Sequence, residues 1–175
     1  MTRRTALKWL HWLCFGLILW FWAVEPQDVA RLGGAALATH AGMGTLLAVL
    51  TAAWAAMFLR KGLASRPGPK LPGWARRAHP AMHKALLWGL AGVVLSGALA
   101  GFAAPYAIAL FGVIPVFPGI GSDAIHGVFE DLHEIAFNLI LIALALHVAF
   151  HLWRHYMVKD NALRIMVPRA LHRYL

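Results

Sequence analysis

The chain has 175 residues, of which 61% are hydrophobic and only 13% are charged. This composition excludes an ordinary soluble domain and predicts a single integral membrane domain over residues 1–175. The single cysteine, Cys14, excludes an internal disulfide, a cysteine-based zinc site, an iron–sulfur cluster and the C-x-x-C-H motif of a c-type haem.

The first predicted span runs from about Thr5 to Val24, after the basic N-terminus MTRRTALK. A run of about 20 apolar residues is long enough to cross a bilayer as a helix. No small-residue cleavage site follows this run, so we expect it to remain as an anchor rather than to be removed as a signal peptide. The second predicted span runs from about Ala36 to Leu59, and the turn-rich connection RPGPKLPG follows at 66–73.

The third predicted span runs from about Met82 to Phe102. Six small residues in it would let a neighbouring helix approach closely: Ala85, Gly89, Gly92, Ser96, Gly97 and Gly101. The apolar stretch 104–122, APYAIALFGVIPVFPGIGS, follows, but its prolines and glycines interrupt any helix. Because an irregular lipid-exposed span is not tolerated, we expect a short interfacial or re-entrant segment, with a fifth spanning helix as the alternative.

The fourth predicted span runs from about Leu132 to Trp153, and its helix continues through His155 to about Lys159. The four spans together predict an all-α fold, a transmembrane four-helix bundle with a short interfacial segment between the third and fourth helices.

The charged residues orient this bundle in the membrane. Fifteen of the sixteen Lys and Arg residues fall on one side of the four-span topology, and only Arg31 falls on the other. Six acids lie on the side of Arg31, namely Glu25, Asp28, Asp123, Glu130, Asp131 and Glu134, whereas Asp160 lies on the basic side. The positive-inside rule therefore places both termini in the cytoplasm. The net charge of +9 would then face anionic lipid headgroups rather than nucleic acid.

Four histidines form two pairs at matching depths. His133 and His147 are 14 residues apart, which corresponds to a rise of roughly 21 Å along a helix. The same 14 residues rotate the helix by about 40° less than four full turns, so both side chains lie on one face. His40 is level with His133, and His11 is level with His147. Facing imidazoles on different helices are what bis-histidine haem ligation requires, so this pattern predicts one haem site near each membrane face. Three nearby glycines would leave room for a porphyrin: Gly16, Gly42 and Gly44.

The remaining histidines leave alternatives open. His83 and His151 lie at a similar depth and form a rival pair for the cytoplasmic haem. Together with His155 they are also candidates for a quinone site, where a protonatable side chain would hydrogen-bond the quinone and carry protons, or they are solvated interfacial residues. We expect three further histidines to be loop or tail residues: His79, His126 and His172. Glu134 beside His133 leaves a zinc site as a weaker alternative to haem.

Several short motifs resemble one known family. They are LHW (10–12), ATHAGMG (38–44), LHE (132–134) followed 14 residues later by LHV (146–148), and the tail HYMVKDNALRIMVP (155–168). With the length, the span count and the orientation, they make the chain similar to the small four-span, di-haem type of the bacterial cytochrome b561 family, and in particular to its superoxide oxidase branch. The resemblance covers nearly the whole chain.

The resemblance implies a bundle with two non-covalent b haems, the periplasmic one held by His40 and His133 and the cytoplasmic one by His11 and His147. It implies a multi-pass protein of the bacterial inner membrane that transfers electrons between a periplasmic partner and the quinone pool. Superoxide:ubiquinone oxidoreductase is the leading specific activity. One arginine against six acids gives the periplasmic side a formal charge of −5, which would repel superoxide and favour a cationic donor such as a basic c-type cytochrome.

Two other functions remain as alternatives. The same haem bundle would serve as the membrane anchor subunit of a periplasmic dehydrogenase or hydrogenase. A haem-free metal or proton transporter is the third hypothesis.

Overall fold

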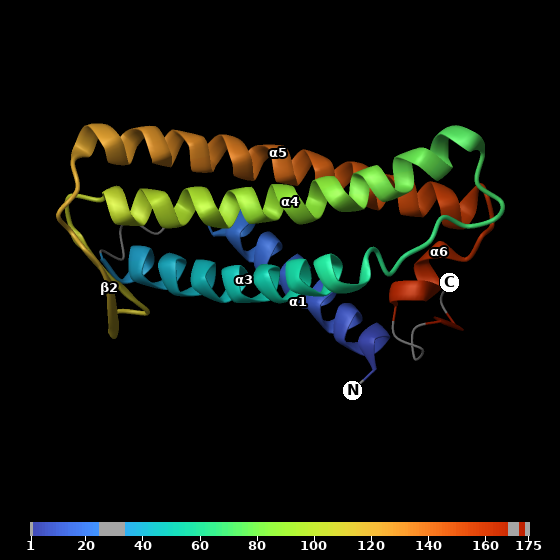
Figure 1. The fold of residues 1–175 in the computed structure, drawn as a ribbon, viewed down its shortest axis with the longest axis horizontal. Coiled ribbons are helices and arrows are strands. Elements are labelled where there is room, and N and C mark those ends of the chain that lie inside the picture. The colour runs from blue at the N-terminus through green and yellow to red at the C-terminus, as the bar shows by residue number, and fades with distance from the viewer. Residues whose placement is uncertain (1, 25–33, 168–171, 174–175) are drawn as a thin grey trace.

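Four long helices form the body of the molecule (Figure 1). The computed structural model describes residues 2–24, 34–167 and 172–173. The helices are α1 (Arg3–Ala23), α3 (Gly34–Lys61), α4 (Gly73–Ala103) and α5 (Asp123–Tyr156), and a short helix α6 (Ala162–Met166) follows them. Each of the four is long and apolar enough to cross a membrane. Leu95, Leu139 and Leu146 are 61%, 61% and 63% exposed, which suits a surface that faces lipid rather than water. The predicted all-α bundle is therefore confirmed.

The helices extend beyond the predicted spans, because capping hydrogen bonds and backbone conformation, rather than hydropathy, determine where each helix begins and ends. At the start of α5, the Ser122 hydroxyl accepts a hydrogen bond from the Ile125 N–H, so the helix begins well ahead of Leu132. Gly62 follows α3 with φ +66°, and its N–H donates to the Phe58 carbonyl, as at many helix C-termini. Pro80 lies inside α4, where it cannot donate to the preceding turn, and α4 bends toward this end in Figure 1.

The segment between α4 and α5 is a β-hairpin. Strands β1 (Ala107–Leu110) and β2 (Ile114–Pro118) pair antiparallel, with a register shift between Ile108 and Ala109. The expected short segment that does not span is present, but it pairs its own backbone groups in a hairpin. The N–H of Phe111, in the turn, donates to the Ala38 carbonyl at 2.9 Å, which fixes the hairpin against the start of α3. A fifth spanning helix is therefore excluded.

Helices α4 and α5 run side by side and pack more closely than any other pair (Figure 1). Small residues of α4 account for this approach, as predicted. A Cβ at Gly89 would lie 2.8 Å from the Ile140 side chain, and one at Gly97 would lie 2.9 Å from the His133 ring. Buried side chains of α1, α3 and α4 form the central core: Cys14, Leu17, Ile18, Phe21, Leu47 and Leu90.

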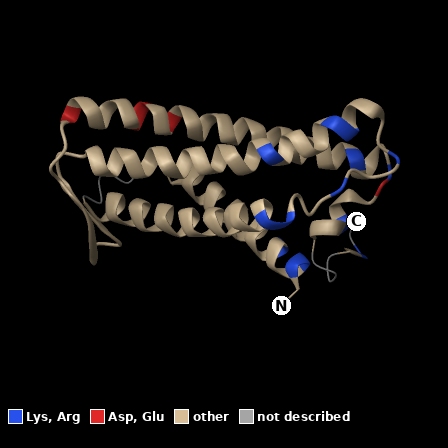
Figure 2. Ribbon diagram, viewed as in Figure 1, with Lys and Arg blue, Asp and Glu red and all other residues tan. Residues whose placement is uncertain are grey.

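Charge divides the bundle into two ends (Figure 2). The acidic end comprises the hairpin and the first turns of α5, with Asp123, Glu130, Asp131 and Glu134. The basic end comprises the start of α1, the α3–α4 connection and the chain after α5. Every Lys and Arg among the described residues belongs to the basic half of the molecule, and Asp160 is the one acid there. The predicted charges at Glu25, Asp28 and Arg31 lie outside the described residues.

Candidate functional site

The first histidine pair lies toward the acidic end. His40 of α3 faces His133 of α5, and their ring centroids are 6.2 Å apart. The Nδ1 atom of His133 lies 3.0 Å from the Val93 carbonyl oxygen. Because a carbonyl can only accept, Nδ1 carries the proton and Nε2 keeps a free lone pair, as in a metal-binding histidine. The Ser96 hydroxyl, which donates to the same carbonyl at 2.9 Å, lies 3.2 Å from His133 Nδ1 and supports its orientation.

The second pair lies toward the basic end. His11 of α1 faces His147 of α5 with ring centroids 6.3 Å apart, and the ring centroid of Trp54 also lies 6.3 Å from that of His11. The Nδ1 atoms of His11, His40 and His147 are all buried without a hydrogen-bond partner. Buried polar atoms are normally paired, so these three side chains retain capacity to bind a further group.

The separation of each pair fits two imidazoles bound to one metal ion. A metal–imidazole bond is about 2 Å long, and the bonded nitrogen lies about 1.2 Å from the centre of its ring. Two imidazoles bound on opposite sides of one metal ion therefore have ring centres about 6.4 Å apart. The observed separations of 6.2 and 6.3 Å are close to this value. The residues present therefore fit bis-histidine haem ligation at two depths, which are roughly 21 Å apart along α5.

The glycines near these pairs differ in the room they leave. A Cβ at Gly16 or Gly44 would meet nothing within 4 Å. The expectation for Gly42 was wrong, because the Phe111 ring lies 2.6 Å from the position of a Cβ there. The hairpin thus covers α3 two residues from His40.

His83 and His151 lie beside the second pair rather than apart from it. The ring centroids of His83 and His147 are 5.0 Å apart, and those of His147 and His151 are 4.6 Å apart. The rival pair, His83 with His151, is separated by 5.6 Å, which is shorter than the spacing expected for opposite ligands of one metal. Geometry therefore favours His11 with His147. His155 is buried and its ring contacts Tyr156.

Two histidines predicted to lie in loops or the tail lie in helices instead. His79 belongs to α4 and is 0% exposed, and His126 belongs to the first turns of α5. The predictions were wrong because both helices continue past the apolar spans.

His126 Nδ1 donates to the Ala100 carbonyl, and its Nε2 accepts from the Tyr106 hydroxyl at 2.9 Å. Burial, and then the nearby carboxylates Glu130 and Asp123, raise the pKa of Tyr106, so this hydroxyl remains a donor. His172 lies after α6, as predicted, and contacts the Val167 carbonyl.

Other site residues carried weak signals in the sequence. The H-x-x-x-H spacing of His79 and His83 places both on one face of a helix, but the predicted third span began only at about Met82. Ser96 and Gly97 were recognised as small packing residues, not as the support of His133. Phe111 gave no signal, because the turn that seats it against α3 depends on tertiary contact.

Comparison with known proteins gives one match. A family model described as prokaryotic cytochrome b561 matches residues 3–169, a range that includes all four long helices and both facing histidine pairs. No curated protein matches the chain.

Proposed function

The chain belongs to the prokaryotic cytochrome b561 family of membrane di-haem electron-transfer proteins, and we propose that it transfers electrons between a periplasmic redox partner and the quinone pool of the bacterial inner membrane. The observation that carries this proposal is the presence of two histidine pairs, each at haem-ligand spacing and at a different depth. Membership of a haem-binding family also argues against the haem-free transporter.

In the proposed orientation the basic end faces the cytoplasm, together with both termini. The support is the distribution of Lys and Arg, since cytoplasmic segments retain positive charge. His40 and His133 would then hold the periplasmic haem b, and His11 and His147 the cytoplasmic one. Bound haem supplies one-electron chemistry, with a potential set by its ligands and surroundings.

The protein side chains position and insulate these sites. Val93 and Ser96 fix the His133 ring, as described above, and the Phe111 ring covers α3 beside His40. If His40 with His133 and His11 with His147 hold the two haems, both histidines of each pair would be used as ligands and neither would be free to be replaced by a substrate. Substrates would therefore exchange electrons at the edges of the sites without bonding to the metal.

A small cavity at the basic end supports a quinone site there. Its volume is about 60 Å³, and its wall includes Arg3, Trp54, Ser65 and His83 among apolar side chains. His83 Nδ1 donates to the His79 carbonyl at 2.7 Å, so its unprotonated Nε2 would accept a hydrogen bond from a quinol hydroxyl. Of the three quinone-site candidates only His83 lines this cavity, whereas His151 and His155 would act from farther away. Reduction of one quinone consumes two electrons and two protons, and a histidine at this end is suited to deliver protons from the cytoplasm.

The leading specific reaction is superoxide:ubiquinone oxidoreductase activity, in which two superoxide ions lose one electron each to become oxygen, and one ubiquinone takes up both electrons and two protons. The acidic end opposes the approach of an anion and favours a cationic donor such as a basic c-type cytochrome. Added salt should therefore accelerate haem reduction by superoxide, because it screens repulsion, and slow reduction by a cationic cytochrome.

The test is stopped-flow spectroscopy of the purified chain mixed separately with superoxide and with ubiquinol. We expect reduction of b haem by at least one of them. His147→Ala should retain one haem, the periplasmic one, and His40→Ala should retain only the cytoplasmic one, as measured by the ratio of haem to protein. His172→Ala is a matched histidine control that should retain both. Two b haems in either ligand variant would contradict the assignment.

The alternative function is a haem-containing anchor subunit of a periplasmic dehydrogenase or hydrogenase. The hairpin favours it, because Val113 and Ile120 are 79% and 84% exposed at the acidic end and offer an apolar surface to a partner. Co-purification of a large soluble subunit would support the anchor role, whereas turnover of superoxide and quinone by the isolated chain would count against it.

A further inference from the structure

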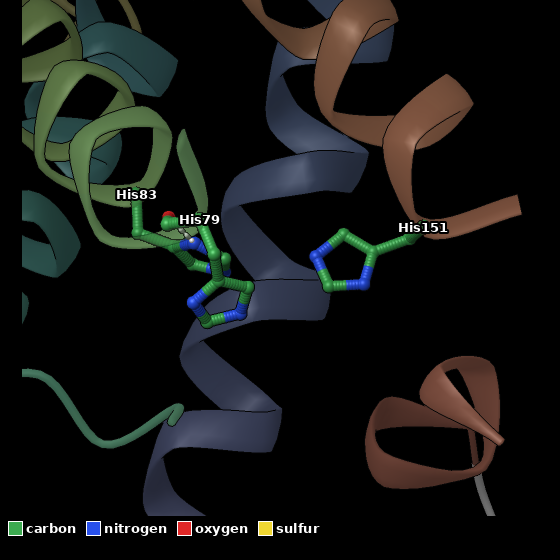
Figure 3. A group of neighbouring side chains, drawn as sticks. All are labelled: His79, His83 and His151. Atoms are coloured by element: carbon green, nitrogen blue, oxygen red, sulfur yellow. Dashed lines mark hydrogen bonds between the residues drawn. The ribbon is translucent and has the colours of Figure 1, made fainter. Parts of the chain in front are cut away.

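A third group of histidines lies at the basic end, beyond the two facing pairs. His79 and His83 lie one turn apart on α4, and His151 faces them from α5 (Figure 3). One ring nitrogen of each lies within 4.8 Å of those of the other two. Two histidines at positions i and i+4 present their imidazoles on one helix face, the arrangement used by many zinc-binding helices. The bundle thus brings three metal-binding side chains to one point.

Hydrogen bonds determine which nitrogens remain available. His83 Nδ1 donates to the His79 carbonyl, so His83 Nε2 holds a free lone pair. His79 Nε2 lies 3.2 Å from the Ser65 hydroxyl, whereas its Nδ1 is buried without a partner. His151 Nε2 is also buried without a partner. Because His79 is 0% exposed, bulk solvent does not contact that nitrogen.

We propose that His79, His83 and His151 form a three-histidine site for a divalent transition-metal ion, with zinc as the representative ligand. Imidazole nitrogens suit Zn²⁺, Cu²⁺ and Ni²⁺, and three protein ligands leave a fourth position for water. Tetrahedral ligands with bonds of about 2 Å are about 3.3 Å apart, so nitrogens within 4.8 Å approach by at most about 1.5 Å. Rotation of the side chains covers such a distance.

The surroundings of this cluster are compatible with a bound cation. Arg154 is the nearest buried positive charge, but its Nε and Nη2 atoms donate to Asp160 at 2.9 and 2.7 Å, so the pair is neutral overall. The Phe150 ring lies 6.3 Å from that of His79 and 5.7 Å from that of His151, and it forms an apolar wall. Such a wall limits access of water and strengthens metal–ligand bonds. The metal would lie beside His147, a proposed haem ligand.

Zinc binding is tested on the haem-loaded protein. The protein is stripped of loosely bound metal with a chelator and dialysed against buffered, low-micromolar free zinc, and zinc and iron are then measured by mass spectrometry. We expect one zinc per two haem irons in the wild type. His79→Gln and His151→Gln should each lose this zinc, and Ser65→Ala should weaken binding by about 10–100-fold, because Ser65 orients a ligand.

His126→Gln is the matched control, since it removes an α5 histidine at the opposite end and should leave zinc binding unchanged. Zinc K-edge absorption of the wild type gives a readout that needs no variant, and we expect scattering from several imidazoles. Absence of stoichiometric zinc in the wild type, equal zinc in all variants, or a zinc shell of oxygen alone would overturn the proposal.

The metal site and the quinone cavity share His83. If the proposed quinone function is correct, bound zinc should therefore slow electron exchange with quinol. The zinc content is measured without any substrate. If only the quinone proposal fails, the protein still binds zinc but zinc has no effect on quinol oxidation; if the metal site fails, the protein binds no stoichiometric zinc.

Discussion

Gly97 of α4 lies against His133, a ligand of the proposed periplasmic haem, and Gly97→Ala tests whether it supports that site. A Cβ at this position would lie 2.9 Å from His133 Cε1 and 3.1 Å from His133 Nδ1. Carbon atoms in contact prefer a separation of about 3.5–4.0 Å, so the ring would have to retreat from α4 by about 0.6 Å or more.

The retreat breaks the hydrogen bond that orients the ligand. Because the Val93 carbonyl lies on the same helix as Gly97, the distance from His133 Nδ1 to this oxygen would grow from 3.0 Å to about 3.6 Å, beyond hydrogen-bond range. Loss of such a supporting contact weakens metal binding by about 10–100-fold. We therefore expect periplasmic haem affinity to fall by that factor, or about 1.4–2.7 kcal/mol.

The assay is haem content during dilution in detergent with apomyoglobin as haem acceptor. Gly97→Ala should lose one of its two haems first, and the retained haem should be the one that His147→Ala removes. Gly92→Ala is the matched control, because a Cβ there would meet nothing within 4 Å and should retain both haems. Equal haem retention by Gly97→Ala and Gly92→Ala would refute the proposed role of Gly97.

Three further predictions concern the hairpin, the buried ion pair and the haem potentials. Phe111→Ala should uncover the surface of α3 at Gly42 and so accelerate reduction of the proposed periplasmic haem by dithionite. Val113→Ala, at an exposed position of the same hairpin, is the control and should leave the rate unchanged. Equal reduction rates in the two variants would exclude a covering role for Phe111. Asp160→Asn should leave the buried Arg154 without its ion-pair partner and lower the free energy of unfolding by about 3–5 kcal/mol. The measurement is the thermal unfolding temperature, with Lys159→Ala as the exposed control. An unchanged unfolding temperature in Asp160→Asn would contradict the prediction. Redox titration of the two single-haem variants should give the periplasmic haem the lower midpoint potential, and the reverse order would be evidence against inward electron flow.

The sequence predicts the bundle well because hydropathy and helical periodicity are local properties. The four spans, and the facing of His133 with His40 and of His147 with His11, follow from depth along straight helices. The hairpin could not be predicted, because β1 and β2 are stabilised by pairing with each other and by contact with α3, not by a pattern within either strand.

The histidine cluster at the basic end shows a second limit of prediction. His79 was assigned to a loop because hydropathy falls before Met82, but a helix needs no apolar residues once it leaves the membrane. Depth along the helix also left His83 with His151 as a rival pair to His11 with His147, since one helical turn separates His147 from His151 and both lie close to His83. Only the ring separations distinguish the pairs, and they depend on how far apart α1, α4 and α5 lie.

The two ends of the bundle differ in charge, and in the proposed orientation this difference would favour inward electron flow. Glu130 and Glu134 lie within one turn of His133, and negative charge stabilises the oxidised state of a nearby haem and lowers its potential. Lysines and arginines gather at the opposite end and would raise the potential of the proposed haem there. An electron moving inward works against the inside-negative membrane potential, at about 2.3 kcal/mol per 100 mV. A lower potential at the proposed periplasmic haem would offset that cost, so the same charge asymmetry would both orient the protein and favour the proposed transfer from the periplasm to the quinone.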